Sequence, residues 1–374
     1  EMILALIGAG RQVGITAFTH KAIINLLDEV IEHARRSGVE VHAIRKLEQN
    51  EKPSEDGPYR TARDNGVVAA ALVQREVQLA AGTAWMWARE EFEGLTDTLF
   101  VDEAGQMSLA NVISVSGAAR NVVLLGDPQQ LSQVRKGAHP EGVDVSSLEY
   151  VLDGSRVIDP RCGLFLSETW RLHPRVNAFT SELFYESQLQ SEQSAAQQAL
   201  SAPDALSGTG VRWVPVEHHG NANDSVEEAD VIVELYRDLL RGTWTDTEGR
   251  VASIAAEDIL VVAPYNAQVE LLTGRLAPIA GPALRIGTVD RIQGQQAAVV
   301  IYSMATSSQE EMPRTMEFLF SLNRLNVATS RGRCMAVIVA SPKLLEVSVH
   351  TPFQMRLANA LCRFVELAEE QTPA

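Results

Sequence analysis

The sequence predicts an α/β protein built on two doubly wound parallel sheets. Short apolar runs typical of buried strands alternate along the chain with segments of helical period, which is the pattern of parallel strands covered by helices. Two of these runs, Leu99–Val101 and Val122–Leu125, end in acidic and small residues, as strands do where a sheet binds its ligand. A length of 374 residues favours two or three domains, and we expect two, at residues 1–160 and 161–374.

The composition excludes several classes of protein. Hydrophobic residues make up 45% and charged residues 21% of the chain, as in ordinary globular proteins, and no apolar run approaches the ~18–20 residues of a membrane span. Residues 1–6 lack the basic leader and cleavage site of a signal peptide. The three cysteines, Cys162, Cys334 and Cys362, lie too far apart for a metal-ligand pair or a disulfide framework. A reducing, cytoplasmic location is therefore expected.

The formal net charge of −16 argues mildly against nucleic acid as a partner, because dedicated DNA-binding domains are usually basic. A protein that contacts few phosphates at a time needs only a local positive groove. The overall charge therefore does not exclude a nucleic-acid partner.

The carboxyl ends of two predicted neighbouring strands carry the residues with the clearest chemical meaning. Asp102 and Glu103 follow the first strand, and Asp127 and Gln129 follow the second. Adjacent carboxylates at such a strand end suit phosphate chemistry, in which one holds a magnesium ion and the other activates a water molecule. Two turns with solvated acids are the alternative, but DEAG followed by GDPQQL, each behind its own apolar strand, favours the phosphate site.

The segments DEAG and GDPQQL resemble motifs II and III of superfamily 1 nucleic-acid helicases. Further segments resemble the other motifs in the order of the family: ITAFTHKA resembles motif Ia, SETWRLHP motif IV, VDRIQGQQ motif V and SLNRLNVATSRGR motif VI. The series is similar to the branch related to nonsense-mediated-decay and DNA-replication nuclease-helicases. Within it, DEAGQMSLANV and LSETWRLHP look most like the helicase half of bacterial proteins that also carry a RecB-like nuclease. The resemblance implies that such a nuclease domain lies upstream in the parent chain.

The resemblance implies two RecA-like domains with ATP and Mg²⁺ in the cleft between them. Asp102 would bind the metal, Glu103 would be the general base, and Arg171 would reach the terminal phosphate. Arg331 would be an arginine finger, a group that contributes roughly 10³–10⁵ in rate elsewhere. The remaining residues implied to contact the nucleotide are Gln129, which is also expected to take part in catalysis, Trp170, Gly294, Gln296 and Arg333.

The same resemblance implies single-stranded DNA or RNA as the partner, with movement from 5′ to 3′. The expected contacts are Thr16, Thr19, His20, Thr83, Pro264, Tyr265, Asn266 and Thr288. Thr19 serves equally well as a helix cap, and residues 264–266 serve equally well as a turn. Trp85 and Trp87 are suited to stacking on bases, but packing in a core or an interface is the expected role of both.

Three departures from the family pattern bear on activity. No GxxxxGK[ST] segment of a P-loop occurs in the chain, Gln296 replaces a glutamate, and Gly332 replaces an alanine. We therefore expect the first domain to be truncated before its P-loop, its sheet to lack a central strand, and its edges to be unpaired. A nucleic-acid-binding module without ATPase activity and an ATPase that remodels protein complexes remain the alternatives.

The pattern also predicts where the chain is irregular. Residues 52–66 and 135–145 are expected to be surface loops, and the Gln-, Ser- and Ala-rich residues 186–210 a mobile loop. Strands are expected at Val39–Ile44 and from Gly163 to Leu166.

Overall fold

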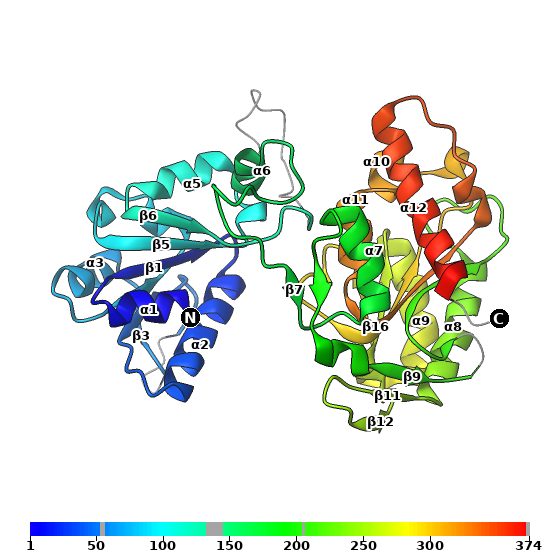
Figure 1. The fold of residues 1–374 in the computed structure, drawn as a ribbon, viewed down its shortest axis with the longest axis horizontal. Helices are drawn as coiled ribbons and strands as arrows, with labels where there is room; N and C mark the ends of the chain where they lie inside the picture. Colours follow the sequence, from blue (N-terminus) through cyan, green and yellow to red (C-terminus); the bar gives the residue numbers. More distant parts are fainter. Residues whose placement is uncertain (53–56, 132–144, 204–205, 372–374) are drawn as a thin grey trace. The chain divides into compact units, whose positions relative to one another are not determined.

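A computed structural model describes residues 1–52, 57–131, 145–203 and 206–371. The chain divides into two compact units, residues 1–155 and 156–374. Each unit is built on one parallel sheet with helices on both faces, so the expected α/β fold with two RecA-like, doubly wound sheets is confirmed (Figure 1). Within the described ranges, no helix combines the length and the apolar character needed to cross a bilayer.

The first unit contains a six-stranded sheet in the order β3-β2-β4-β1-β5-β6, in which every neighbouring pair is parallel. Its strands are β1 (Val13–Ala17), β2 (Ala43–Lys46), β3 (Arg60–Ala62), β4 (Leu79–Ala81), β5 (Thr96–Asp102) and β6 (Ala119–Leu124). One face packs against α1 (Met2–Gly8) and α2 (His20–Arg36). The other face packs against α3 (Asn65–Val73), α4 (Ala84–Trp87) and α5 (Leu109–Ser116), and α6 (Ser147–Leu152) follows.

Helix α2 shows how the sequence produces this layer. The Thr19 hydroxyl accepts a hydrogen bond from the Ala22 N–H at 3.2 Å and caps the helix, while Ile23 and Leu27 begin its buried stripe. Gly38, with φ 67°, follows the helix in a conformation that favours glycine. Strand β1 precedes this helix, and all five of its residues are buried.

The sheet of the first unit has no gap among its described strands. β1 lies inside it, hydrogen-bonded to β4 and β5. The pairing of the strands that are present does not test whether a further strand belongs to the sheet, so the expected missing strand stays a prediction. The described sheet ends at β6, where the side chains of Val122, Val123 and Leu124 are only partly buried. Parallel strands are usually buried on both faces, so β6 is the strand of this sheet with the least cover.

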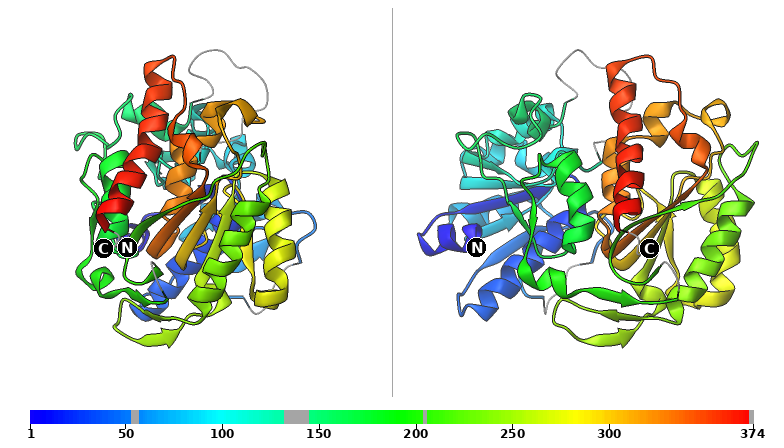
Figure 2. Two further views of the ribbon diagram at one scale, coloured as in Figure 1. Left: turned by 90° about the vertical axis from the view of Figure 1, so that its right-hand side faces the viewer. Right: turned by 45° about the vertical axis from the view of Figure 1, so that its right-hand side comes forward.

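The second unit contains a five-stranded parallel sheet in the order β10-β16-β15-β13-β14. Its strands are β10 (Gly210–Pro215), β13 (Ile259–Ala263), β14 (Arg285–Thr288), β15 (Ala297–Ser303) and β16 (Gly332–Ala340). α8 (Val226–Leu240) and α9 (Asn266–Ala280) cover one face, and the other face carries α7 (Pro174–Phe184), α11 (Leu322–Thr329) and α12 (Pro352–Gln371) (Figure 2). The short helix α10 (Met316–Leu319) precedes α11.

Several expectations for irregular segments were wrong. Residues 186–210 contain β8 (Gln190–Ser191), which pairs with β7 (Glu168–Thr169), and β9 (Ala199–Ser201), which joins β11 (Thr243–Thr245) and β12 (Val251–Ser253) in an antiparallel sheet. β3 and the start of α3 fall within 52–66, the strand expected at 39–44 lies at 43–46, and residues 163–166 form no strand. Strands of two or three residues are too short to show a period of two. The loop expected at 135–145 lies outside the described residues except for Val145.

A buried polar network connects the loop after β15 to α8. His218 Nε2 lies 3.0 Å from Glu228 Oε1, and His218 Nδ1 lies 2.7 Å from the Ser307 hydroxyl. The second oxygen of Glu228 accepts hydrogen bonds from the Ser303 hydroxyl at 2.5 Å and from the Ala305 N–H at 2.9 Å. All of these side chains are buried, so each depends on the others for its hydrogen bonds.

Gly332 begins β16 where the chain has no room for a side chain. A Cβ atom at this position would lie 2.2 Å from the carbonyl oxygen of Met335 and 2.9 Å from Val300 Cγ1. The register between β15 and β16 shifts at the same place. The replacement of the alanine of the family pattern by glycine is therefore required by the backbone of this chain.

Gly332→Ala is expected to destabilise the protein by ~1–3 kcal/mol, because the added methyl forces the backbone of β16 to move. Urea unfolding of the full chain measures the effect. The matched control is Gly274→Ala within α9, where nothing lies within 4 Å of the added methyl and alanine is the better helix former. Equal stability of Gly332→Ala and the parent would contradict the steric argument.

His173 begins α7 and caps it with its ring. Its Nδ1 accepts a hydrogen bond from the Arg175 N–H at 3.1 Å, which requires an unprotonated nitrogen. Burial of the ring, together with the charge of Arg175, lowers the pKa of His173 below its ordinary value of 6.5. The unfolded chain therefore binds a proton on this residue at a higher pH than the folded chain does.

The cap predicts that the protein becomes less stable as the pH is lowered. The contribution of His173 is fully present above pH 6.5 and is lost as the pH falls through the lower pKa of the folded state. His173→Asn keeps a capping oxygen that does not titrate and is expected to reduce the loss of thermal stability between pH 7.5 and 5. Thermal unfolding monitored by circular dichroism tests this, with exposed His350→Asn as control. An unchanged pH dependence in His173→Asn would contradict it.

Candidate functional site

The carboxyl ends of β5 and β6 are packed together by their loops. The Ala104 N–H donates to the Leu125 carbonyl at 2.8 Å, and the Leu125 N–H donates to the Val101 carbonyl at 2.8 Å. A Cβ atom on Gly105 would lie 2.9 Å from the Asp127 carbonyl oxygen, and one on Gly126 would lie 2.9 Å from the Ala104 nitrogen. Glycine at both positions allows the two loops to touch, which brings the predicted residues of motifs II and III onto adjoining loops.

Asp102 is a partly buried carboxylate without a basic partner among the described residues. Burial raises its pKa above the ordinary value, and a hydrogen bond from the Glu103 N–H at 3.0 Å acts in the opposite direction. Glu103 has φ 51°, which turns the chain sharply after the strand, and its Oε2 accepts a hydrogen bond from Gln106 Nε2 at 3.2 Å. A desolvated carboxylate of this kind gains stability from a nearby cation.

Asp127 organises the neighbouring loop. Its Oδ1 accepts a hydrogen bond from the Gln129 N–H at 2.9 Å, and its Oδ2 accepts one from Gln130 Nε2 at 3.1 Å. Both carboxylate oxygens of Asp127 therefore hold its own loop together. Gln129, the predicted nucleotide contact, is held by its backbone and is partly exposed.

The described residues contain no group of three or more histidine, cysteine, aspartate or glutamate side chains placed to hold a metal ion. Mg²⁺ is commonly bound through one or two carboxylates together with substrate phosphates rather than in an all-protein cage. Asp102 fits that mode, because burial desolvates its carboxylate, no basic side chain among the described residues pairs with it, and a phosphate-bound cation would supply the opposite charge.

Arg171 and Arg333 in the second unit are connected through a residue that the sequence did not reveal. The Nε2 of the buried Gln198 donates to the Arg171 carbonyl at 3.0 Å and reaches the Arg333 carbonyl at 3.5 Å. The His173 N–H also donates to the Arg333 carbonyl, at 2.8 Å. Gln198 lies in the segment expected to be a mobile loop, whose composition gave no signal for it.

Arg331 and the motif V loop lie together. The Arg331 side chain is only 4% exposed, its Nη1 is 3.5 Å from the Gln295 carbonyl, and its own carbonyl accepts from the Ala297 N–H at 3.0 Å. Gly294, with φ 78°, turns the chain ahead of an exposed Gln296. The structure thus places three predicted nucleotide contacts around one loop.

The other two predicted nucleotide contacts differ in exposure. Trp170 is 68% exposed. The guanidinium of Arg333 lies 4.4 Å from the ring centre of Trp244 in β11, and its buried Nε has no hydrogen-bond partner in the described residues. Burial lowers the pKa of Arg333 below its ordinary value. Trp244 was not expected from the sequence, because it belongs to a strand too short to recognise.

The predicted nucleic-acid contacts of the first unit fall into two groups. Thr16 is fully buried in β1, whereas Thr19 is exposed and its hydroxyl caps α2. His20 Nδ1 lies 3.3 Å from Glu48 Oε1 on the surface. Thr83 begins α4 without a capping hydrogen bond from its side chain, so its hydroxyl remains available to a ligand.

Most of the predicted nucleic-acid contacts of the second unit are buried. Pro264, Tyr265 and Thr288 are buried, and Asn266 is exposed. The Tyr265 ring stacks on Phe318 with centroids 5.6 Å apart. Beside Phe318, the Arg314 and Arg324 guanidiniums each lie 4.3 Å from its ring centre. Phe318, Arg314 and Arg324 were not among the predicted contacts.

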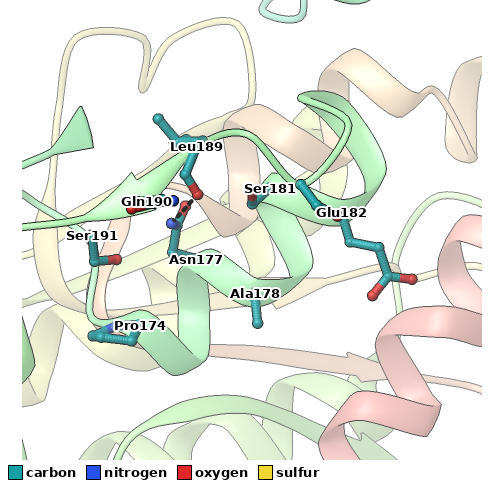
Figure 3. Close-up of a pocket in the computed structure, with 9 residues that line it drawn as sticks. Pro174, Asn177, Ala178, Ser181, Glu182, Leu189, Gln190 and Ser191 are labelled. Atoms are coloured by element: carbon teal, nitrogen blue, oxygen red, sulfur yellow. Dashed lines mark hydrogen bonds between the residues drawn. The ribbon is translucent and has the colours of Figure 1, made fainter. Parts of the chain in front are cut away.

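A cavity of about 420 Å³ in the second unit lies away from the predicted residues. It is lined by α7 and the chain around β8, and Asn177 Nδ2 donates to the Leu189 carbonyl at 2.9 Å within it (Figure 3). The Asn177 Oδ1 and Ser191 Oγ atoms are buried without a hydrogen-bond partner in the described residues. Polar and apolar groups line the cavity in similar measure, and none of its side chains indicates a particular chemistry.

Comparison with known proteins assigns this sequence to a family. Residues 144–343 match the model of the AAA domain family AAA_12. The chain is 29% identical to the putative helicase mov-10-B.1 of Danio rerio, over 66% of this chain and 27% of that protein. It is 26% identical to the DNA polymerase alpha-associated DNA helicase A of Schizosaccharomyces pombe, over 63% of this chain and 36% of that protein. The chain thus spans about a quarter to a third of the length of these relatives.

Among solved structures, an Arterivirus nonstructural protein 10 helicase aligns with 90% of this chain and 55% of its own, at 13% identity and a TM-score of 0.46. The family match, by contrast, covers more than half of the sequence. The chain therefore belongs to the AAA domain family, and its helicase relatives support the resemblance to superfamily 1 helicases.

Proposed function

We propose that this chain is the motor portion of an ATP-dependent helicase or translocase that acts on single-stranded nucleic acid. Asp102 would bind Mg²⁺ together with the nucleotide phosphates, Glu103 would activate the attacking water, and Gln129 would sense the terminal phosphate. Arg171 and Arg331 would contribute positive charge from the second unit, and Arg331 would act as the arginine finger.

The observation that carries this proposal is the contact between the loops after β5 and β6. The partly buried carboxylate of Asp102 ends β5, and the Glu103 carboxylate and the Gln129 amide lie on the two adjoining loops at the same sheet edge. That edge is where open parallel sheets bind ligands. A pair of ordinary solvated turns would not require glycine at both points of contact.

The nucleotide contacts of the second unit would be Trp170, Gly294, Gln296 and Arg333. An amide at Gln296 still forms hydrogen bonds with ribose hydroxyls, although without the charge of a carboxylate. The nucleic-acid contacts would be Thr19, His20, Thr83 and Asn266, whose side chains are not buried.

The finer assignments are part of the same proposal. By resemblance to its branch, the motor would move from 5′ to 3′ and would function in the cytoplasm beside a RecB-like nuclease domain of the parent chain. The relatives include an RNA helicase, Mov10l1 of Mus musculus, and a DNA helicase of Schizosaccharomyces pombe, so both nucleic acids are candidates.

Glu103→Gln is expected to lower ATP turnover by ~10²–10⁴-fold while leaving ATP binding intact, because it removes the base and keeps the shape. The measurement is nucleic-acid-stimulated phosphate release by a longer version of the chain that carries a P-loop. Glu149→Gln, in the capping box of α6, is the control. Turnover near the parent rate in Glu103→Gln would exclude Glu103 as the base.

The 374-residue chain is expected to bind ATP weakly and to hydrolyse it negligibly. Most phosphate-binding energy in this fold comes from the P-loop amides and lysine and from the helix behind them, and the sequence contains no P-loop. Calorimetry with Mg²⁺ and a slowly hydrolysed ATP analogue decides the matter. Micromolar binding would show that the nucleotide is held by other residues.

A further inference from the structure

Trp85 is the most exposed large hydrophobic side chain among the described residues, with 88% of its surface accessible. It lies on the single turn of α4, two residues from Trp87, which is only 1% exposed. An indole ring forgoes substantial stabilisation when it remains in water. The contrast between these two neighbours therefore calls for a reason other than core packing.

Helix α4 is held firmly, so Trp85 is not exposed because its surroundings are loose. Trp87 Nε1 donates to the Ile15 carbonyl in β1 at 3.0 Å, and its ring meets Phe92 edge-on with centroids 5.4 Å apart. Gly14 leaves room for this ring, since a Cβ atom there would lie 2.9 Å from it. Burying Trp87 fixes the turn in an orientation that directs Trp85 into solvent.

Trp85 stands at the same sheet edge as the predicted nucleic-acid contacts of the first unit. β1 and β4 are paired in parallel with Ile15 opposite Ala81, so the residues after both strands emerge side by side. Thr19, His20 and Lys21 follow β1, while Thr83 and Trp85 follow β4. Phe18 adds a second, partly exposed aromatic ring at this edge.

The chemistry of this edge suits one kind of occupant. Hydroxyl and basic groups hold phosphates, whereas an exposed aromatic ring offers a flat apolar face to a base. The Thr83 hydroxyl makes no capping bond, and Lys21 is exposed. A single strand, whose bases are unpaired, supplies both the phosphates and the flat faces.

We propose that Trp85 is a base-stacking residue that anchors one base of a single strand at the carboxyl ends of β1 and β4. This inference rests on the proposed nucleic-acid function and adds to it a contact to a base. Stacking on an aromatic face tolerates every base, which suits a motor that must move along any sequence.

The test is fluorescence anisotropy of the 374-residue chain with fluorescein-labelled single-stranded oligothymidylate. Trp85→Ala is expected to weaken binding about tenfold to a hundredfold, and Trp85→Phe only a few-fold, because phenylalanine still stacks. The slope of affinity against salt stays unchanged in Trp85→Ala, since no ionic contact is lost. Lys21→Ala, in contrast, is expected to reduce that slope by about 0.7.

Two controls separate the possible outcomes. Val73→Ala removes an exposed apolar group at the end of α3, before β4 begins, and should leave binding unchanged. Quenching of intrinsic tryptophan fluorescence by the oligonucleotide should be reduced in Trp85→Phe, even if Trp85→Ala fails to fold.

Parent-like binding and quenching in both Trp85 variants would overturn the stacking role and leave the proposed function standing. A parent chain that binds no oligonucleotide at low salt would overturn both.

Discussion

The contact between the loops after β5 and β6 is the constraint on which the candidate site depends. Parallel strands bring their carboxyl ends to one edge of a sheet, but this alone leaves the loops several ångströms apart. Glycine at positions 105 and 126 removes the two Cβ atoms that would otherwise separate them. Asp102, Glu103 and Gln129 therefore belong to one packed structure, in which a shift of one loop displaces the other.

The second unit arranges its arginines by a similar close approach of backbone. Gly332 lets β16 begin against Val300, and the carbonyl of Arg333 is held by the Gln198 side chain and the His173 N–H. The segments that carry Arg171 and Arg333 are therefore connected through main-chain atoms. The guanidinium of Arg333 in turn packs against the ring of Trp244.

The long periodic elements and the strand ends were predictable from the sequence. α2, β1, β5 and β13 have strong apolar patterns and clear end signals, and the packed loops after β5 and β6 carry the residues that the motifs DEAG and GDPQQL suggested. The strands that the sequence did not predict are short or depend on contacts with distant residues. β8, β9 and β11 have two or three residues, too few for a period, and their partners lie far away in the sequence.

The individual site residues show the same limit. Sequence patterns gave Trp85 and Trp87 the same expected role. In the structure, Trp87 is buried and hydrogen-bonds the Ile15 carbonyl, whereas Trp85 is exposed. Thr16 and Thr83 both matched contact motifs, although Thr16 faces the core. Which face of a strand or turn a residue occupies depends on neighbouring strands, and a single sequence does not contain that information locally. The connection made by Gln198 depends in the same way on tertiary structure.

The buried network of His218, Glu228, Ser303 and Ser307 has a consequence for how this protein can change over evolutionary time. Each member satisfies a hydrogen bond of another inside the core, so replacing one alone leaves a desolvated group without a partner. Replacing all four with apolar residues would still leave the buried Ala305 N–H without its acceptor and Gln268 Nε2 without the Ser303 hydroxyl. Related chains should therefore keep these four positions polar together, and the loop after β15 should vary in step with α8.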